Sequence, residues 1–274
     1  NYNFTGNALT TSLDVSSTDK SASSGYKSNS TGFEIGTSFE QYENVYISPS
    51  IAVSSESIDV ESTASSNIKK MEGSYFNSDL LYVIALDKRN QSFQPTEGYK
   101  ASFVQSLPII QDSSSILNGI NFSGYHDFTE DVIGSLKFYG RAIKGIDDDV
   151  RLSERLFLPS KRLRGFVAGK VGPKDGKDWV GGNYNAALSA EAQLPNLLPE
   201  SYRTDISVFL DTGNVWGVDY DKGRDESQLI RSSAGIGASV WTPVGPLTWT
   251  FSQNLTKADT DSTESFNFRL GTSF

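Results

Sequence analysis

The feature that most constrains this chain is an alternation of apolar and polar residues with a period of two, repeated along nearly its whole length. In the segment 204–211, for example, Ile206, Val208 and Leu210 alternate with polar residues. Successive side chains of a β-strand point to opposite faces, so each such segment is expected to be a strand with one apolar and one polar face. No segment of useful length repeats with the period of a helix. The sequence therefore predicts an all-β fold.

Thirteen segments follow this pattern, and most of them are about ten residues long. A tilted transmembrane β-strand needs about 9–11 residues to cross a bilayer. Short connections such as 129–130 alternate with long polar ones such as 158–182, as they do in outer-membrane barrels. We therefore expect a transmembrane antiparallel β-barrel that forms one domain over residues 1–274. The expected strands are 2–15, 30–41, 44–59, 74–87, 99–108, 115–127, 131–144, 150–158, 183–195, 203–213, 229–242, 245–256 and 264–274.

A soluble β-sandwich shows the same alternation with its apolar faces turned inward, so periodicity alone leaves both folds open. The composition favours the membrane, because only 37% of the residues are hydrophobic while 12% are aromatic. Aromatic residues also recur near segment ends, where the girdles of a transmembrane barrel would lie. The residues expected in these girdles are Tyr46, Tyr75, Tyr139, Tyr202, Trp216 and Trp241.

The charge and the reactive side chains argue against several function classes. A net charge of -9 argues against a nucleic-acid partner, because a phosphate footprint needs clustered lysine and arginine. The single histidine, His126, has no serine in a Gly-x-Ser-x-Gly setting to work with. The acidic runs 147–149 and 259–261 lack the spacing of a calcium loop, so we interpret them as solvated loop charge. We expect no catalytic residue, no metal and no cofactor.

The long connection around Arg162–Phe166 carries unusual chemistry for a surface loop. An arginine stands beside glycine and phenylalanine, and a glycine-proline turn follows at Gly172. The guanidinium of Arg164 is always charged and presents a rigid fork of donors, so in a confined place it needs carboxylate partners. The residues alone leave two readings open: a solvated basic loop tip, or a packed loop that directs Arg164 at acidic groups.

Several of these segments resemble one known family. Arg162–Phe166 (RLRGF), followed by Gly172–Lys174 (GPK), is similar to the loop-six signature of the BamA family of outer-membrane β-barrel assembly factors. Further blocks within 87–98, 180–191, 209–216 and 231–247 resemble the same family, in the family's order. Residues 1–86 match it only in their strand rhythm.

The resemblance implies that a loop at about 159–182 folds into the barrel and is pinned there by Arg164. Its implied partners are Glu191 and Asp211, which the alternation also places on the polar faces of neighbouring strands. Such a contact is structural and regulatory rather than catalytic. The residues that carry the implied motif are Arg164, Gly165, Phe166, Gly172 and Pro173.

The family barrel has sixteen strands, and its first and last strands form a lateral gate. About thirteen of the strands would lie in this chain, and the POTRA domains and first barrel strands would lie outside it. The segment 264–274 would be the C-terminal gate strand, in which a glycine weakens packing and an open edge invites pairing. The residues alone leave open whether this strand parts from its neighbour. The implied gate residues are Phe266, Phe268, Leu270, Gly271 and Phe274.

By resemblance, the chain would insert and fold β-barrel proteins into the bacterial outer membrane without enzymatic chemistry. The implied partners are the lipoproteins of the assembly complex, client barrel proteins, a periplasmic chaperone, and membrane lipid with lipopolysaccharide. Two other classes stay open. One is a translocation or secretion pore of the same superfamily, such as a TamA-like or two-partner transporter. The other is a passive porin or a lipid-modifying barrel enzyme.

Overall fold

The computed structural model of the chain describes residues 2–4, 7–19, 25–199, 204–220, 224–225, 227–242 and 245–271. Within them, one antiparallel sheet of 13 strands follows the order β1-β2-β3-β4-β5-β6-β7-β8-β11-β12-β14-β15-β16. The prediction of an all-β antiparallel fold is confirmed. The strands of this sheet are β1 (Tyr2–Phe4), β2 (Asn7–Asp19), β3 (Tyr26–Tyr42), β4 (Val45–Val60), β5 (Gly73–Asp87), β6 (Gly98–Gln111), β7 (Ser115–Thr129), β8 (Val132–Gly145), β11 (Tyr184–Leu194), β12 (Thr204–Trp216), β14 (Arg231–Thr242), β15 (Gly245–Thr256) and β16 (Phe266–Leu270).

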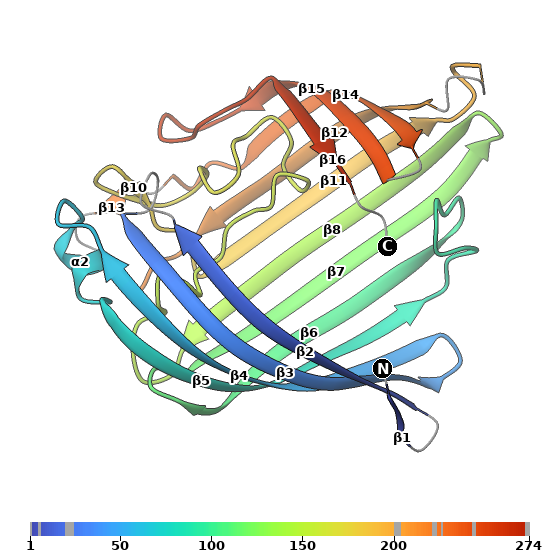
Figure 1. Ribbon diagram of the computed structural model, residues 1–274. Helices are drawn as coiled ribbons and strands as arrows, with labels where there is room; N and C mark the ends of the chain where they lie inside the picture. Colours follow the sequence, from blue (N-terminus) through green and yellow to red (C-terminus); the bar gives the residue numbers. More distant parts are fainter. Residues whose placement is uncertain are drawn as a thin grey trace.

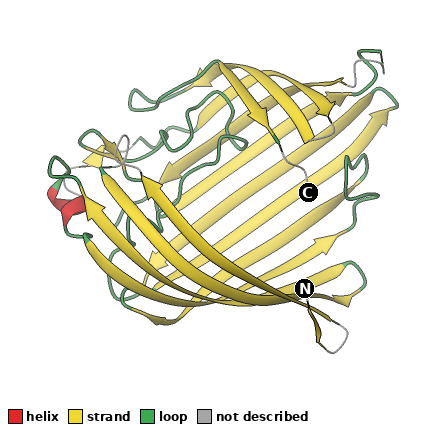
Figure 2. Ribbon diagram, in the orientation of Figure 1, coloured by secondary structure: helices red, strands yellow, loops and turns green. Residues whose placement is uncertain are grey.

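The sheet curls into a single wall around a hollow (Figure 1). Each strand of the wall pairs with the wall strands before and after it in the chain, and β8 pairs with β11 across the long connection between them, so the wall is a continuous meander. The strands β1 and β16 are its two edges, and no backbone pairing joins them among the described residues. Figure 2 shows in red how little of the described chain is helical, namely the short helix α2 (Ser66–Lys69) that Figure 1 labels.

The two faces of the wall have opposite polarity. Apolar side chains on the outer face stay open to the surroundings, with Leu210 exposed by 50% and Phe251 by 59%. Buried positions of the same wall hold polar groups instead, including Glu56, Asp211 and Ser233. A soluble sandwich buries its apolar faces between two stacked sheets, so this single inside-out wall excludes that alternative. In the described part of the chain, no helix has the length and apolar character to span a membrane.

The strand boundaries differ from the prediction in three places. The predicted strand 150–158 is wrong: residues there form turns, in which the amides of Glu154 and Arg155 donate to the carbonyl of Arg151. The predicted first strand, 2–15, is two strands, β1 and β2. The predicted loop 16–29 is largely strand, because β2 and β3 extend further than the alternation indicated. The predicted and observed numbers of strands in the wall are both thirteen, because the wrongly predicted strand 150–158 is offset by the division of 2–15 into β1 and β2.

Two of the six residues predicted for the aromatic girdles face inward instead. Tyr75 contacts the Arg151 guanidinium at 4.8 Å from its ring centroid, and Tyr139 contacts that of Arg162 at 5.0 Å. Trp216 fits the prediction better, since it stacks on Tyr184 with ring centroids 5.8 Å apart. Tyr202 lies outside the described residues.

The connection 146–183 between β8 and β11 turns into the hollow (Figure 1) and contains two short strands, β9 (Lys174–Asp175) and β10 (Asp178–Trp179). In a small second sheet, β9 pairs with β10 on one side and with β13 (Arg224–Asp225) on the other. We call the whole connection 146–183 the inner loop. Leu152 and Val180, near its two ends, pack against β3–β5, and its middle part packs against β11 and β12, so it spans the hollow from one half of the wall to the other.

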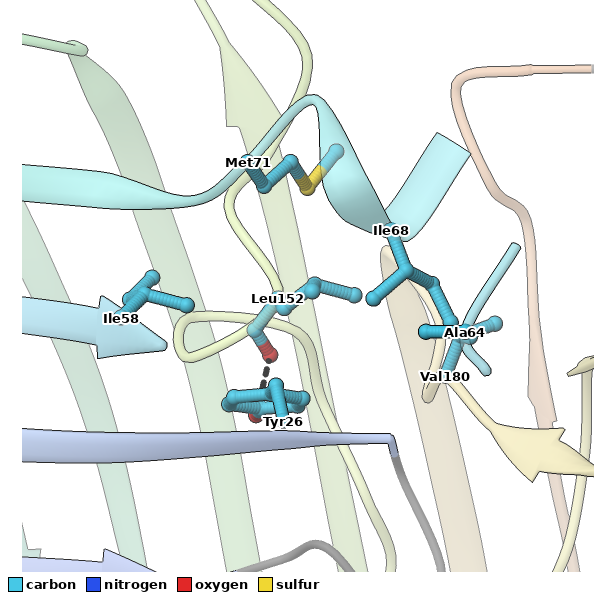
Figure 3. Close-up of a cluster of buried hydrophobic side chains, with 7 residues drawn as sticks. All are labelled: Tyr26, Ile58, Ala64, Ile68, Met71, Leu152 and Val180. Atoms are coloured by element: carbon cyan, nitrogen blue, oxygen red, sulfur yellow. Dashed lines mark hydrogen bonds between the residues drawn. The ribbon is translucent and has the colours of Figure 1, made fainter. Parts of the chain in front are cut away.

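Figure 3 shows the apolar cluster that holds the two ends of the inner loop against β3, β4 and the segment around α2. Leu152 and Val180 come from the inner loop, and the Tyr26 hydroxyl donates a hydrogen bond to the Leu152 carbonyl at 3.0 Å. The other members are Ile58, Ala64, Ile68 and Met71.

Candidate functional site

Arg164 of the inner loop lies between carboxylates of β11 and β12. Its Nε and Nη2 donate to the two carboxylate oxygens of Asp211 at 2.7 and 2.8 Å, and its Nη1 donates to Glu191 Oε2 at 3.0 Å. The side chain of Asp211 is fully buried, and those of Arg164 and Glu191 are only 12% and 13% exposed. The structure therefore brings together the three residues that the sequence singled out.

Further contacts fix the orientation of this guanidinium. Ser189 accepts a hydrogen bond from Arg164 Nη2 at 3.0 Å and donates one to Asp211 at 2.6 Å. The guanidinium carbon lies 3.5 Å from the centroid of the Phe209 ring, so a cation–π contact supports it from one side. The backbone N–H of Arg164 also donates to Asp211 at 3.0 Å. Each of the three guanidinium nitrogens of Arg164 therefore donates to at least one acceptor, as is usual for a buried arginine.

The strand register explains why these acids meet. In the β11–β12 pair, Ser189 lies opposite Asp211 and Glu191 lies opposite Phe209. Residues two apart on one strand share a face, so these four side chains form one inward-facing patch. The outward neighbours Leu188 and Leu210 are 39% and 50% exposed. Alternation alone thus directs the acids to the hollow.

Gly165 and Phe166 join the inner loop to the connection that leads into β16. The Gly165 carbonyl accepts hydrogen bonds from Asn254 Nδ2 at 2.9 Å and from the Glu264 N–H at 3.1 Å. Phe166 forms an isolated β-bridge with Thr263. The φ angle of Gly165 is +90°, and a Cβ there would lie 3.1–3.2 Å from side-chain atoms of three neighbouring residues. Only glycine fits this position without strain.

Phe166, Gly172 and Pro173 occupy the interior of the same loop. Phe166 is 2% exposed and belongs to an apolar cluster with Leu158, Leu163, Val171, Ala187 and Val215. Gly172 has a φ of +101°, and a Cβ on it would approach Val215 Cβ to 2.7 Å. The buried Pro173 accepts a hydrogen bond from the Val180 N–H at 3.1 Å. These residues pack the loop, and none of them presents a reactive group.

A second charged anchor holds the first part of the inner loop. Arg151, which is 2% exposed, donates to Asn77 at 2.7 Å and to Glu154 at 2.5 Å, and its Nη1 lies 3.6 Å from Glu56. Glu56 also accepts hydrogen bonds from Ser28 and Ser153. This group ties the loop to β3, β4 and β5, on the opposite half of the wall from Asp211.

Arg155 extends the second anchor toward the connection after β12. Its Nη2 lies 3.7 Å from Asp219, and its guanidinium lies 5.2 Å from the centroid of the Tyr220 ring. Burial is the main cause that raises the pKa of Tyr220 to about 12. Burial likewise raises the pKa of Glu154, although the nearby charge of Arg151 opposes this shift.

A third buried arginine, Arg231, begins β14. Its Nε and Nη2 donate to the two oxygens of Asp261 at 2.8 and 2.9 Å, and both side chains are fully buried. Its Nη1 donates to Asn214 and to the carbonyls of Ser227 and Leu229. The interpretation of 259–261 as solvated charge is therefore wrong for Asp261, whereas residues 147–149 are exposed as expected.

The predicted gate residues lie in and just after β16. Phe266, Phe268 and Leu270 are 49%, 50% and 57% exposed on the outer face, and they alternate with inward-facing Asn267 and Arg269. Gly271 directly follows the end of β16. Phe274 lies outside the described residues.

The contacts of the site are ion pairs, hydrogen bonds and apolar packing. Among the described residues, no group of His, Asp and Glu is arranged to hold a metal ion. His126 lies edge-on to the Phe128 ring, with ring centroids 4.9 Å apart. Sequence reasoning missed Arg151, Arg155 and Arg231, because their partners come from distant segments and leave no local pattern. What the arrangement can do is hold the inner loop and the start of β16 in defined positions.

A meandering antiparallel wall with apolar residues outside, polar residues inside and an arginine-anchored loop in its hollow defines a transmembrane β-barrel of the outer-membrane type. All 274 residues match the model of the Omp85 superfamily domain. The chain therefore belongs to the Omp85 superfamily and is an outer-membrane protein.

Three proteins of similar sequence carry names that refer to assembly. The chain is 27% identical over 261 residues to the outer membrane protein assembly factor BamA of Neorickettsia risticii, covering 91% of this chain and 34% of that protein. It is 33% identical over 140 residues to BamA of Neisseria meningitidis, covering 41% of this chain and 17% of that protein. It is 27% identical over 191 residues to the human sorting and assembly machinery component 50 homolog, covering 64% of this chain and 40% of that protein. The chain thus spans about a third of the first of these relatives.

The fold also matches a solved structure. Haemophilus ducreyi BamA lacking POTRA domains 1–3 superposes with a TM-score of 0.84 at 21% identity, covering 96% of this chain and 58% of that one. CdiB from Acinetobacter baumannii superposes with a TM-score of 0.58 at 11% identity, covering 88% and 41%. At these identities, the two superpositions show a shared fold.

Proposed function

We propose that this chain is the membrane domain of an outer-membrane protein assembly factor, which inserts and folds other β-barrel proteins. Residues 1–274 act as one barrel domain in this proposal. The relatives named BamA and the sorting and assembly machinery component support the assembly role. The reaction is non-covalent and uses no catalytic residue or cofactor.

The observation that carries the proposal is the anchored inner loop: Arg164, held by Glu191 and Asp211, fixes residues that pair with the segment leading into β16. The Ser252 N–H donates to the Ser265 carbonyl at 2.9 Å, so Ser265 directs its backbone toward β15. Backbone groups in an antiparallel pair alternate between facing the partner and facing away. Phe266, Phe268 and Leu270 therefore direct their N–H and C=O groups away from β15, to the side where a further strand would pair.

An open edge in lipid is a template for another strand. Each unpaired backbone group in the hydrocarbon core costs several kcal/mol, so a client strand that pairs with β16 satisfies groups on both chains. This pairing is the same strand addition by which many proteins bind extended peptides. The apolar outer face of β16 continues into the lipid and lets the nascent barrel grow beside it.

The inner loop has a structural role in this mechanism. Arg164, with Glu191 and Asp211, holds the loop in the hollow, while Gly165, Phe166, Gly172 and Pro173 give it a packed shape. The loop reaches both halves of the wall and fixes the segment that leads into β16. Its contacts keep the edge strand in register while a client strand arrives.

The partners that this function requires are client barrel proteins and the lipid beside the β16 edge. The proposal extends to the lipoproteins of an assembly complex, a periplasmic chaperone and lipopolysaccharide, because the named relatives are assembly factors. A passive porin is disfavoured, since the inner loop occupies the hollow with buried side chains such as Phe166 and Leu163. A translocation or secretion pore of the same superfamily is the alternative, and none of the three relatives compared by sequence carries such a name.

The experiment compares Phe268→Pro with Phe268→Ala in the full-length protein reconstituted in liposomes. Both variants remove the aromatic ring, but only proline also removes the N–H at the open edge. We expect folding of an added client barrel to fall about tenfold further in the proline variant, because client pairing loses a backbone hydrogen bond in lipid. Equal client folding by the two variants and the wild type would refute pairing at this edge.

A further inference from the structure

The connection between β15 and β16, residues 257–265, is held by two buried arginine systems at once. At one end, Arg231 forks onto Asp261, and both side chains are fully buried. At the other end, the inner loop, itself pinned by Arg164, pairs with residues 262–264. The last strand of the sheet starts directly after these contacts, at Phe266.

The pairing between the inner loop and this connection is a short backbone ladder. The Val167 N–H donates to the Ser262 carbonyl at 2.9 Å, and the Ser262 N–H donates to the Lys170 carbonyl at 3.0 Å. The Glu264 N–H donates to the Gly165 carbonyl at 3.1 Å, with the Phe166–Thr263 bridge between these bonds. Three hydrogen bonds and one bridge therefore join the inner loop to the residues that precede β16.

Asp261 holds the turn that directly precedes this ladder. Besides the Arg231 fork, its Oδ2 accepts the Ala258 N–H at 2.7 Å, and its own N–H donates to the Ala258 carbonyl at 3.1 Å. The carboxylate thus closes a tight turn and ties it to β14. The next residue, Ser262, is the first one in the ladder.

We propose that Arg231 and Asp261 are a positioning pair for the terminal strand. They fix the turn before Ser262, the ladder with the inner loop forms on this fixed turn, and the ladder sets the register in which the β16 edge meets a client strand. The inference rests on the proposed assembly function. It adds to that function two residues that act through backbone geometry and touch no client.

The contacts of Arg231 explain why this position takes arginine. Two nitrogens of the guanidinium donate to Asp261, and the third donates to Asn214 and to the Ser227 and Leu229 carbonyls. Lysine has a point charge without the planar fork and cannot satisfy this set. The Arg231 carbonyl also accepts a hydrogen bond from Thr212 on β12, so both ends of the residue bind to the wall.

The test uses Asp261→Asn in the full-length protein, with Asp259→Asn as the matched control. Asp259 lies in the same connection but is exposed. Two quantities are measured: hydrogen exchange of the Val167, Ser262 and Glu264 amides, and assembly of an added client barrel in liposomes. Amides in the β11–β12 pair, such as that of Ala190, report whether the wall itself stays folded.

We expect Asp261→Asn to speed exchange of the three ladder amides about tenfold and to reduce client assembly, because a charge-assisted hydrogen bond is lost. Exchange at Ala190 should stay unchanged, and Asp259→Asn should behave as the wild type. Unchanged ladder exchange, or faster exchange with full assembly, would overturn the proposal.

If Asp261→Asn does not fold, the same two measurements are made on Arg231→Lys, which keeps the charge and removes the fork. A wild-type protein that assembles no client would instead overturn the proposed function. The exchange result would still test whether Arg231 and Asp261 hold the ladder in place.

Discussion

The guanidinium of Arg164 and the carboxylate of Asp211 form a two-point contact, Nε to Oδ2 at 2.7 Å and Nη2 to Oδ1 at 2.8 Å, inside the hollow of the sheet. The same carboxylate also accepts the backbone N–H of Arg164. Asp211 therefore binds both the side chain and the main chain of the inner loop. It has no access to solvent that could replace these bonds.

Removal of this arginine should be costly. Arg164→Ala strands the fully buried Asp211, and breaking one member of a buried ion pair typically costs about 3–5 kcal/mol. We expect the folded barrel to unfold at lower temperature in heat-shift gel migration and client assembly to decrease. The control is Lys161→Ala, which removes an exposed cation three residues earlier. Identical migration and assembly in Arg164→Ala and wild type would exclude the pinning role.

The glycine after Arg164 should be replaceable only with strain. Gly165→Ala adds a Cβ 3.1 Å from Ser252 Oγ at a φ of +90°, so we expect roughly 1–3 kcal/mol of local destabilisation. Gly176→Ala is the matched control, because Gly176 also has a positive φ, +62°, but nothing within 4 Å of an added Cβ.

Tryptic cleavage of the inner loop measures this difference. Faster cleavage in Gly165→Ala than in Gly176→Ala shows that crowding, beyond the backbone angle, holds Gly165 in place. Equal cleavage rates in the two variants would contradict this reading.

The second anchor should stabilise the loop on its own side of the hollow. Arg151→Gln removes the charge that faces Glu56, a residue only 7% exposed, and we expect a loss of about 3–5 kcal/mol. Hydrogen exchange should rise around Leu152, while amides near Gly165 keep their protection. A uniform rise over the whole inner loop would show that the two anchors act as one cooperative unit.

The pH dependence of the second anchor follows from Glu154. Burial raises its pKa in the folded chain above the unfolded value, so the folded state holds this proton more tightly. The stability that protonated Glu154 contributes is fully present below the ordinary carboxyl pKa and is lost as pH rises through the raised pKa of the folded chain.

Glu154→Gln should therefore gain stability relative to the wild type as pH rises from about 4 to about 8 in urea unfolding. The control is Glu97→Gln, at an exposed position in the connection between β5 and β6. A difference in stability between Glu154→Gln and wild type that does not change with pH would contradict a raised pKa of Glu154.

The sequence allowed the wall and the contact of Arg164 with Glu191 and Asp211 to be predicted for a physical reason. A strand's period of two is local, so the outward Leu210 and the inward Asp211 can be told apart from neighbouring residues. The resemblance to the BamA family then indicated which arginine faces Glu191 and Asp211. Contacts of this kind lie on a face that the local pattern already defines.

The remaining contacts could not be predicted, because they depend on segments that meet only in three dimensions. The alternation of Val150 and Leu152 with charged residues imitates a strand, yet Arg151 is buried against Asn77, 74 residues away. Asp261 looks like one of several solvated acids until Arg231 is placed beside it. Long-range pairing of charges leaves no period to detect.

The central claim is that the apolar face of this wall meets lipid while its polar face encloses a wet hollow. The chain has no cysteine, so single cysteines can be introduced along β12 and spin-labelled in the reconstituted protein. Labels at Val208 and Leu210 should be relaxed by lipid-soluble oxygen, and a label at Ser207 by a water-soluble paramagnetic reagent. The reverse pattern, or equal access of both reagents to all three positions, would contradict the account.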